Sequence, residues 1–374
     1  MEKLKVLHVV GAMNRAGTET MLMNVFRYID RTKIQFDFIS YSQENAHYDD
    51  EIRSLGGNIF KLNRTTSLKE LFHTMKQNGP YDVVHSHTMF HCGLSNLAAM
   101  LAGVKLRISH AHTTLVKSDT FVRKLYIHMM RALIRATSTH LLACSKESGT
   151  YLYGQYAGNI RNYSFFPNLI DYKQFSHPKL MSEKDLIQEL NITKGKVIGH
   201  IGRFIDSKNH LFLLEVMKEI VKIDEEFTLL LVGDGDLRGT VEQEAMKLGI
   251  FNSIRFIGIR EDVNHLLNCM DVFVFPSKYE GLGLVLLEAQ ASGVPCVVSE
   301  AIQPEADLGI GLFTKLSLQQ TAREWAEVTL HSLEKKETNK EKINEAFENS
   351  DYSLSNGIQK LTNLYKANDQ WREI

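Results

Sequence analysis

Residues 272–299 read VFVFPSKYEGLGLVLLEAQASGVPCVVS, and this stretch decides the fold class of the chain. An apolar run, VFVF, ends in a turn that contains a proline, and a helical segment then runs from Gly281 to Ala291. A Gly-Val-Pro turn ends that helix, and a second apolar run, CVVS, follows. Two short apolar runs joined by a helix are typical of a βαβ unit with parallel strands.

The same alternation extends in both directions along the 374 residues. Strands are expected at residues 5–11, 36–41, 58–62, 81–87, 105–112, 140–145, 196–203, 227–235, 253–260, 272–277 and 295–299. Helices are expected at residues 17–29, 121–138, 210–223 and 237–248 as well as in the opening stretch. A segment with two prolines and mixed charge interrupts the pattern at 165–195 and is expected to be a linker.

These two βα series predict an α/β protein with two doubly wound domains, at residues 1–170 and 171–350. Residues 351–374 are amphipathic, so a C-terminal helix is expected to pack back on one or both domains. In folds of this class ligands bind beyond the carboxyl ends of the strands, here in a cleft between the domains.

The composition excludes several classes of protein. The net charge of −1 indicates no nucleic-acid partner, although residues 1–170 carry a balance of +8 and the remainder −9, as if the two halves faced different partners. The four cysteines are scattered without metal-ligand spacing, and no apolar run approaches the roughly 18 residues that span a membrane. A protein of the reducing cytoplasm is expected.

Two carboxylates stand out in the opening stretch, Glu280 and Glu288. Glycines at a helix start let backbone approach a ligand, and the first unpaired N–H groups favour an anion. A phosphate would account for the glycines, and a carboxylate on either side of it could accept hydrogen bonds from sugar hydroxyls. The alternative is purely structural. Glu280 would be an acid that interacts favourably with the helix dipole, and Glu288 would be a solvated position on the helix.

Cations should stand opposite such a phosphate, and GHIGRFIDSKNH supplies Arg203 and Lys208 just after a strand. The glycines of LVGDGDLRG are similar to the dinucleotide-binding motif G-x-G-x-x-G. The third glycine, however, stands one residue further along the chain than that motif requires. A tight strand-to-helix turn is the better explanation, with Asp236 or nearby N–H groups capping the helix.

In the first half, Gly17 and Thr18 follow the first strand and could present backbone N–H groups to a ligand, or could form a plain βα turn. Histidines gather after two other strands, in HSHTMFH and SHAH. No carboxylate or cysteine completes a ligand set, so no metal site is predicted, and a histidine lining a ligand cleft is favoured instead. The histidines in question are His85, His87, His91, His110 and His112.

Cations also concentrate between residues 105 and 135, where FVRKLYIHMMRALIRATS has apolar residues at helical spacing. A basic amphipathic helix can rest on an anionic membrane surface. A helix that packs on the core with a charged outer face is the alternative. The cations are Lys105, Arg107, Lys117, Arg123, Lys124, Arg131 and Arg135.

Taken together, these motifs resemble the retaining glycosyltransferases of family 4, which have the GT-B architecture of two Rossmann-like domains that face each other across a cleft. The resemblance covers essentially the whole chain and is most specific in E-x7-E followed by A-S-G-V-P. Ala16-Gly17 departs from the two glycines of many relatives, and Leu282 stands where phenylalanine is common.

The resemblance implies a set of roles. Glu288 would bind the ribose hydroxyls of a sugar nucleotide, Glu280 the donor sugar, and the N–H groups from Gly281 to Leu284 the distal phosphate. Arg203 and Lys208 would neutralise the leaving diphosphate, and His112 would lie beside the reacting sugar. The implied catalytic residues are Arg203, Lys208, Glu280 and His112. The implied substrate-binding residues are Gly17, Thr18, Gly202, Gly233, Gly235, Ile259, Arg260, Gly281, Leu282, Gly283, Leu284 and Glu288.

The leading hypothesis is therefore a hexosyltransferase that moves a sugar with retention from a nucleotide donor, by resemblance a UDP-sugar, to a glycan or lipid-linked glycan in surface polysaccharide synthesis. No cofactor or metal is expected, because the two cations and the helix start would stabilise the leaving group. The basic first domain would face a membrane-attached acceptor, which implies a peripheral location at the inner face of the membrane. A sugar-nucleotide epimerase or hydrolase and a non-catalytic sugar-nucleotide-binding subunit are the alternatives.

Overall fold

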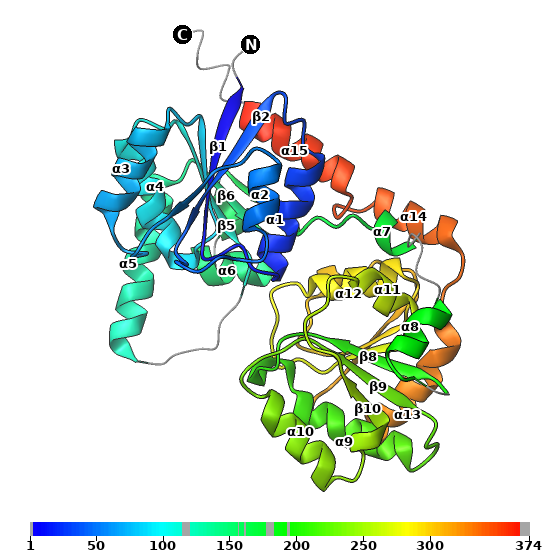
Figure 1. Cartoon of the computed structure of the whole chain (residues 1–374). Coiled ribbons are helices and arrows are strands. Elements are labelled where there is room, and N and C mark those ends of the chain that lie inside the picture. Colours follow the sequence, from blue (N-terminus) through cyan, green and yellow to red (C-terminus); the bar gives the residue numbers. More distant parts are fainter. Residues whose placement is uncertain are drawn as a thin grey trace. The chain divides into compact units, whose positions relative to one another are not determined.

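The computed structural model describes residues 3–113, 120–155, 157–160, 162–176, 183–192 and 195–366. The chain forms two compact units (Figure 1). The first unit comprises residues 1–169 and 351–374, and the second comprises residues 170–350. The C-terminal segment therefore returns to the unit in which the chain begins.

In the described part of the first unit, seven parallel strands form one sheet in the order β3-β2-β1-β4-β5-β6-β7. This order, in which the chain moves outward from β1 first to one side and then to the other, is doubly wound. The strands are β1 (Leu4–Val10), β2 (Ile34–Ser40), β3 (Ile59–Lys61), β4 (Val83–Ser86), β5 (Leu106–Ala111), β6 (His140–Ala143) and β7 (Tyr163–Phe165). The helices are α1 (Gly17–Tyr28), α2 (Asp49–Ser54), α3 (Leu68–Asn78), α4 (Cys92–Leu101), α5 (Phe121–Thr137), α6 (Lys146–Tyr153) and α15 (Leu354–Lys366).

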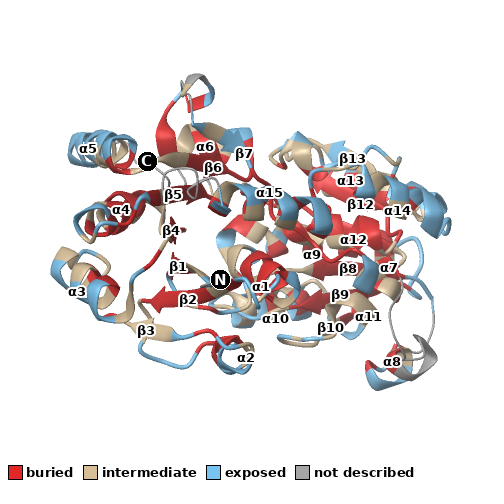
Figure 2. Cartoon of the chain, turned by 90° about the horizontal axis from the view of Figure 1, so that it is seen from above, coloured by how far each residue is buried: buried red, intermediate tan, exposed pale blue. Residues whose placement is uncertain are grey.

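Most residues of the central strands of this sheet are buried (Figure 2), whereas those of the edge strands β3 and β7 are not. Successive residues of a strand point to opposite faces, so Val6 of β1 packs in one apolar cluster and Leu7 in another. Helix α15 contributes Leu361 and Tyr365 to the cluster that contains Val6. The C-terminal helix belongs to the first unit because its apolar stripe completes that core.

The described part of the second unit contains six parallel strands in the order β10-β9-β8-β11-β12-β13. They are β8 (Val197–Ile201), β9 (Thr228–Val232), β10 (Ile254–Phe256), β11 (Val272–Phe275), β12 (Cys296–Ser299) and β13 (Phe313–Leu316). The helices are α7 (Lys173–Ser176), α8 (Glu183–Glu189), α9 (His210–Val221), α10 (Arg238–Lys247), α11 (Val263–Asn268), α12 (Leu284–Ala291), α13 (Ala322–Ser332) and α14 (Lys340–Glu348). This sheet is doubly wound as well, with β8 beside β11 at the point where the strand order reverses.

The segment expected to be a linker contains two short helices, α7 and α8, which belong to the second unit. Just before α7, the Tyr172 ring stacks on Phe347 with 4.8 Å between ring centroids. Asn268 Nδ2 donates to the carbonyl of Phe175 at 3.0 Å. Strands β7 and β13 were not expected, because each has three or four residues at a sheet edge and little apolar pattern. Pro178 of the expected linker lies outside the described residues.

No helix among the described residues combines the length and the apolar character needed to cross a membrane.

Candidate active site

Three loops meet at the carboxyl edge of the second sheet and hold one another in place. Backbone hydrogen bonds join Gly202 N to Val232 O at 2.9 Å, and Phe204 N to Asp234 O at 3.0 Å. A third joins Gly233 N to Gly258 O at 2.8 Å. The turns after β8, β9 and β10 therefore form one connected platform at the edge where doubly wound sheets bind ligands.

Gly233 is required by this platform. Its φ is 129°, and a Cβ there would lie 2.2 Å from the carbonyl oxygen of Gly202. Gly235 is similarly confined, because a Cβ would lie 2.7 Å from Phe204 O. These contacts support the interpretation of a tight strand-to-helix turn. The expected capping by Asp236 is wrong, since α10 has Leu237 at its N-cap and no side-chain cap bond.

Lys208 and Glu280 form an ion pair in this unit. Their side chains are only 16% and 15% exposed, and the Lys208 ammonium lies 4.5 Å from the centroid of the Phe275 ring. Lys278 N donates to Ser207 O at 2.8 Å, which ties the loop after β11 to the loop after β8. The sequence assigned Lys208 and Glu280 to different parts of a ligand, and the structure brings the two side chains together.

The glycine turn before α12 differs from the expected helix start. The helix begins at Leu284 rather than at Gly281, because Gly283 adopts a left-handed conformation with φ of 77° and serves as the N-cap. Leu282 is buried, at 1% exposure, so its side chain does not offer a surface to a ligand. In the first turn of α12, Leu286 N donates to Gly283 O at 2.8 Å. The N–H groups of Leu284 and Val285 have no intrahelical acceptor at i−4 and are suited to an anion.

Glu288 lies one turn into α12 with a partly buried side chain. Burial raises the pKa of its carboxyl to about 7. No hydrogen bond to its carboxylate oxygens occurs among the described residues. A carboxylate held in such surroundings gains from hydroxyl donors, because they replace the water it has lost.

The two arginines of the predicted site differ in their surroundings. Arg203 is exposed, and its guanidinium has no ion pair within the described part of the chain. Arg260 bonds Asp262 and Glu189, both at 2.7 Å, and these contacts raise the pKa of its guanidinium. The neighbouring Ile259 is 55% exposed, so the turn offers backbone and an apolar side chain, while its cation is already paired.

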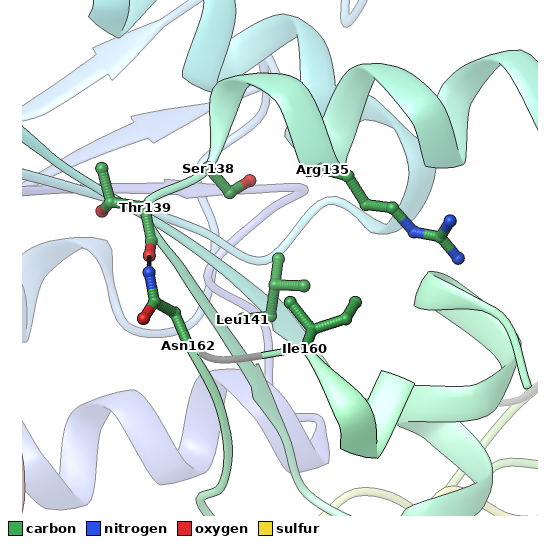
Figure 3. Close-up of a pocket in the computed structure, with 6 residues that line it drawn as sticks. All are labelled: Arg135, Ser138, Thr139, Leu141, Ile160 and Asn162. Carbon is green, nitrogen blue, oxygen red and sulfur yellow. Dashed lines mark hydrogen bonds between the residues drawn. The ribbon is translucent and has the colours of Figure 1, made fainter. Parts of the chain in front are cut away.

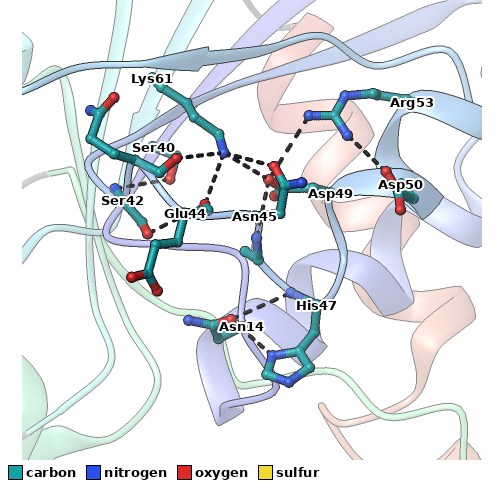
Figure 4. Close-up of polar contacts among 12 residues, drawn as sticks. Asn14, Ser40, Ser42, Glu44, Asn45, His47, Asp49, Asp50, Arg53 and Lys61 are labelled. Atoms are coloured by element: carbon teal, nitrogen blue, oxygen red, sulfur yellow. Dashed lines mark hydrogen bonds and ion pairs between the residues drawn. The ribbon is translucent and has the colours of Figure 1, made fainter.

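In the first unit, α1 begins at Gly17 with Ala16 at the N-cap and no side-chain cap bond. Gly17 is exposed and Thr18 is partly buried. The preceding loop is fixed by Asn14, whose Oδ1 accepts from His47 Nδ1 at 2.8 Å (Figure 4). The same figure shows how Lys61 organises that neighbourhood. Its ammonium donates to Glu44 O at 2.8 Å and lies 3.5 Å from the Asp49 carboxylate, whose side chain is 2% exposed.

Histidines within the central strands of this sheet, and just after them, form two hydrogen-bonded rows. In the inner row, His85 Nδ1 bonds Tyr365 Oη at 2.8 Å and His85 Nε2 bonds His110 Nδ1 at 3.3 Å. His110 Nε2 donates to Phe166 O at 3.0 Å.

In the outer row, His8 Nδ1 bonds His87 Nε2 at 3.1 Å and His87 Nδ1 bonds His112 Nε2 at 2.8 Å. His112 Nδ1 bonds Asn168 Oδ1 at 3.1 Å. Both ring nitrogens of His112 therefore have partners within the first unit.

Burial keeps these imidazoles neutral. It lowers the pKa of His8 to about 3 and that of His112 to about 4. It also lowers the pKa values of His85, His87 and His110 well below the ordinary value, with the neighbouring rings as a second cause. His91 stands apart on a short 3-10 helix.

Sequence reasoning missed His8, Asn168 and Tyr365, which complete the two rows. A lone histidine in KVLHVV was the only available signal for His8.

A hollow of about 260 Å³ lies elsewhere in the first unit (Figure 3). Ser138 and Thr139 in its wall precede β6, so it opens at the amino-terminal edge of the sheet. None of the predicted site residues lines it. Its lining residues are Arg135, Ser138, Thr139, Leu141, Ile160 and Asn162.

Comparison with known proteins gives a consistent picture. Residues 15–173 match the family model described as Glycosyltransferase Family 4, and residues 195–333 match Glycosyl transferases group 1. The putative glycosyltransferase EpsF of Bacillus subtilis is 37% identical over 98% of this chain and 97% of its own length. The capsular polysaccharide biosynthesis glycosyltransferase CapH of Staphylococcus aureus is 29% identical over 76% of this chain and 78% of its own. The Escherichia coli UDP-Gal:alpha-D-GlcNAc-diphosphoundecaprenol alpha-1,3-galactosyltransferase is 27% identical over 79% of both chains.

Among solved structures, Anabaena Alr3699/HepE in complex with UDP-glucose superposes with a TM-score of 0.79 at 18% identity. The match covers 97% of this chain and 100% of that one. WaaG, a glycosyltransferase involved in lipopolysaccharide biosynthesis, superposes with a TM-score of 0.72 at 16% identity over 96% and 99%. Both likenesses concern the fold, which is the GT-B architecture.

Proposed function

This chain belongs to the family 4 glycosyltransferases, and from that premise we propose that it transfers a hexose-type residue from a UDP-sugar to a glycan or lipid-linked glycan in surface polysaccharide synthesis, with retention. The observation that carries the proposal lies in the second unit. There, Lys208 of the loop after β8 pairs with Glu280, which lies four residues before the start of α12, and Arg203 of the same loop is exposed. Cations, a carboxylate and open backbone N–H groups are what a sugar diphosphate requires.

The donor would be held by groups of opposite character. The N–H groups at the glycine turn from Gly281 to Leu284 donate hydrogen bonds to the distal phosphate, and the Glu288 carboxylate accepts hydrogen bonds from the ribose hydroxyls. Arg203 and Lys208 neutralise the charge that develops on the leaving diphosphate. The ion pair with Lys208 fixes the position of the Glu280 carboxylate, which contacts the hydroxyls of the transferred sugar.

The remaining predicted residues keep supporting roles in this proposal. Gly202, Gly233 and Gly235 shape the platform on which the donor lies, and the turn at Ile259 and Arg260 meets the base. In the first unit, Gly17, Thr18 and His112 are proposed contacts of the phosphates and the sugar.

Several relatives support the choice of donor and acceptor. The Escherichia coli relative is named for UDP-galactose and a diphosphoundecaprenol-linked sugar, and the Anabaena neighbour was solved with UDP-glucose. A UDP-sugar and a lipid-linked glycan are therefore the first substrates to test.

Catalysis is proposed to need no metal, because two cations and a helix start can stabilise the diphosphate. The test is a thermal-shift titration with UDP, GDP, ADP and CMP, each with and without EDTA. A ligand that binds only the folded state stabilises it by about 2.7 kcal/mol at 100 Kd. A shift with UDP that survives EDTA supports the proposal, whereas no shift with any nucleotide would favour a non-catalytic subunit. Retention is checked by the anomeric configuration of the product in NMR.

The first turns of α5 support an additional partner, an anionic membrane surface. In Figure 1 they extend beyond the other helices of the first unit. Their apolar side chains are exposed, so the alternative of a core-packing helix does not hold for this half of α5. These side chains are Phe121 (79% exposed), Val122 (76%), Leu125 (51%), Tyr126 (40%) and Met129 (61%).

Only some of the cations counted near this helix remain available to a membrane. Arg131 and Arg135 donate to the backbone oxygens of Tyr151 and Tyr153, and Arg107 donates to Thr137 O. Lys117 lies outside the described residues. Arg123 is exposed on the first turn of α5, and Lys105 is exposed just before β5.

The membrane proposal is tested with vesicles of phosphatidylcholine with and without phosphatidylglycerol at low salt. We expect sedimentation with the anionic vesicles, and weaker sedimentation for Leu125→Ser and Met129→Ser. Leu211→Ser on α9, where a leucine is 44% exposed, is the matched control. Equal binding by the α5 variants and wild type would remove α5 from the proposal.

A further inference from the structure

Three histidines at the ends of neighbouring strands stand in a geometry suited to a metal ion. β4 and β5 pair in parallel with Ser86 opposite Ser109, so the next residues, His87 and His110, are neighbours. His112 comes two residues after His110 and therefore points to the same face. One nitrogen from each of the three rings lies within 4.8 Å of the other two.

In each of the three rings, the nitrogen that would not bind the metal already has a hydrogen-bond partner, as is usual for ligating histidines. His110 Nε2 donates to Phe166 O, and His112 Nδ1 bonds Asn168 Oδ1. The third ring, His87, has its Nε2 against His8 Nδ1. Ligating histidines almost always have their second nitrogen bound in this way, which fixes ring orientation and tautomer. The nitrogens that these contacts leave as candidate ligands are Nδ1 of His87, Nδ1 of His110 and Nε2 of His112.

These nitrogens are hydrogen-bonded to other rings in the described structure, so coordination must replace those bonds. His87 Nδ1 and His112 Nε2 are 2.8 Å apart. Two ligand atoms of a tetrahedral zinc ion, with bonds of about 2.0–2.1 Å, stand roughly 3.3 Å apart. This pair must therefore open by about 0.5 Å, and the pairs with His110, for which the bound is 4.8 Å, must come to the same spacing, so coordination requires the rings to rotate. The His85 to His110 bond that would also be lost is long, at 3.3 Å.

Coordination of the metal changes the tautomers of His87 and His8 but not the number of protons on the histidines. His87 Nδ1 carries the hydrogen shared with His112, and on coordination this hydrogen must sit on His87 Nε2, facing His8 Nδ1. His8 then carries its own hydrogen on Nε2. That atom is buried without a hydrogen-bond partner among the described residues, beside the Phe36 ring at 4.4 Å between centroids. A hydrogen on that nitrogen would have no hydrogen-bond acceptor among the described residues.

We propose that His87, His110 and His112 form a binding site for Zn²⁺ or a similar transition-metal ion, with a fourth coordination position open to solvent. Three imidazoles without a carboxylate suit zinc or copper and not magnesium or calcium, which prefer oxygen. His87 and His112 are partly exposed, whereas the second three-histidine group, with His8 and His85, is more deeply buried. The more accessible group is therefore the site.

Occupation of this site would inhibit transfer, because His112 Nε2 would be bound to the metal. This consequence rests on the proposed function, in which His112 lies beside the reacting sugar. The metal site itself does not depend on that function. Binding and inhibition are accordingly measured separately.

The binding experiment is calorimetric titration of the chelator-stripped full chain with ZnCl₂, and with MgCl₂ for comparison. One Zn²⁺ per chain and no response to Mg²⁺ are expected. His110→Asn and His87→Asn should each weaken Zn²⁺ binding at least 100-fold, and Asn168→Ala about 10–100-fold through the second shell. His73→Asn, on the exposed face of α3, is the control and should bind as wild type does.

Melting curves without metal distinguish a lost ligand from a lost fold. If a ligand variant does not fold, Co²⁺ titration of wild type gives the answer, because tetrahedral coordination by nitrogen produces strong visible absorption. Absence of that absorption, or Zn²⁺ binding that is equal in wild type and the folded ligand variants, would overturn the site. Zn²⁺ binding without loss of transfer would leave the site standing and would remove His112 from the sugar contacts.

Discussion

The carboxyl edges of the two sheets are built differently. In the first unit, the two rows of histidines bond to one another and end on Tyr365, Phe166 O and Asn168, although His8 Nε2 is buried without a partner among the described residues. In the second unit, Glu288 is partly buried without a hydrogen-bonding partner among the described residues, and Arg203 is exposed without an ion pair among them. The first edge is organised by its own hydrogen bonds, and the second has polar groups that a ligand could satisfy. The comparison supports the proposal that the donor-binding groups lie chiefly in the second unit.

The largest effect is expected at Arg203. Arg203→Ala should lower the rate of sugar transfer by about 10²–10³, because a group that stabilises developing charge acts mainly in the transition state. Steady-state kinetics with the identified donor measure this loss. Arg323→Ala, at a 78% exposed arginine on α13, is the matched control and should be silent. Unchanged turnover in Arg203→Ala would remove the leaving-group role.

Gly233 tests the platform rather than the chemistry. Gly233→Ala should destabilise the second unit by about 3 kcal/mol, because the new Cβ meets a backbone oxygen and the positive φ is strained. Gly239→Ala is the control, since that glycine lies in α10 with open space around it and should gain about 0.5–1 kcal/mol. Urea unfolding measures both. Equal stability of the two variants would contradict the contact between the loops.

Glu288 should give the second unit a pH dependence of stability. Its folded pKa of about 7 lies above the value of 4.5 expected when unfolded, so the folded state binds more protons between these values. The contribution is fully present below pH 4.5 and is lost as the pH rises through 7. Relative to Glu288→Gln, the wild type should lose about 1–2 kcal/mol of stability between pH 5.5 and 8.5. Parallel curves for the two proteins would mean that Glu288 is well solvated.

Tyr365 gives the smallest effect and tests the other edge. Tyr365→Phe should cost about 1 kcal/mol, because His85 Nδ1 is left without its buried hydrogen bond while the ring packing is kept. Chemical denaturation followed in the first unit measures the loss. An unchanged midpoint would show that the inner row is not held by α15.

Much of the fold could be predicted from the sequence, because parallel strands and their helices leave a local signature of apolar runs and turns. The stretch at residues 272–299 indeed forms β11, α12 and β12. Short edge strands such as β7 lack that signature, so they were missed. The start of α12 was wrong by three residues, because the left-handed conformation of Gly283 depends on the packing around it.

For the candidate site, local pattern predicted which residue types follow each strand, including Arg203, Lys208, Glu280 and Glu288. The sequence carries this information because glycine turns and charges at strand ends are local features. Only the tertiary structure decided that Lys208 pairs with Glu280, 72 positions away, and that Tyr365 bonds His85 across 280 positions. Such pairings depend on which strands become neighbours and on how the chain returns to its first unit, and no spacing along the chain encodes them.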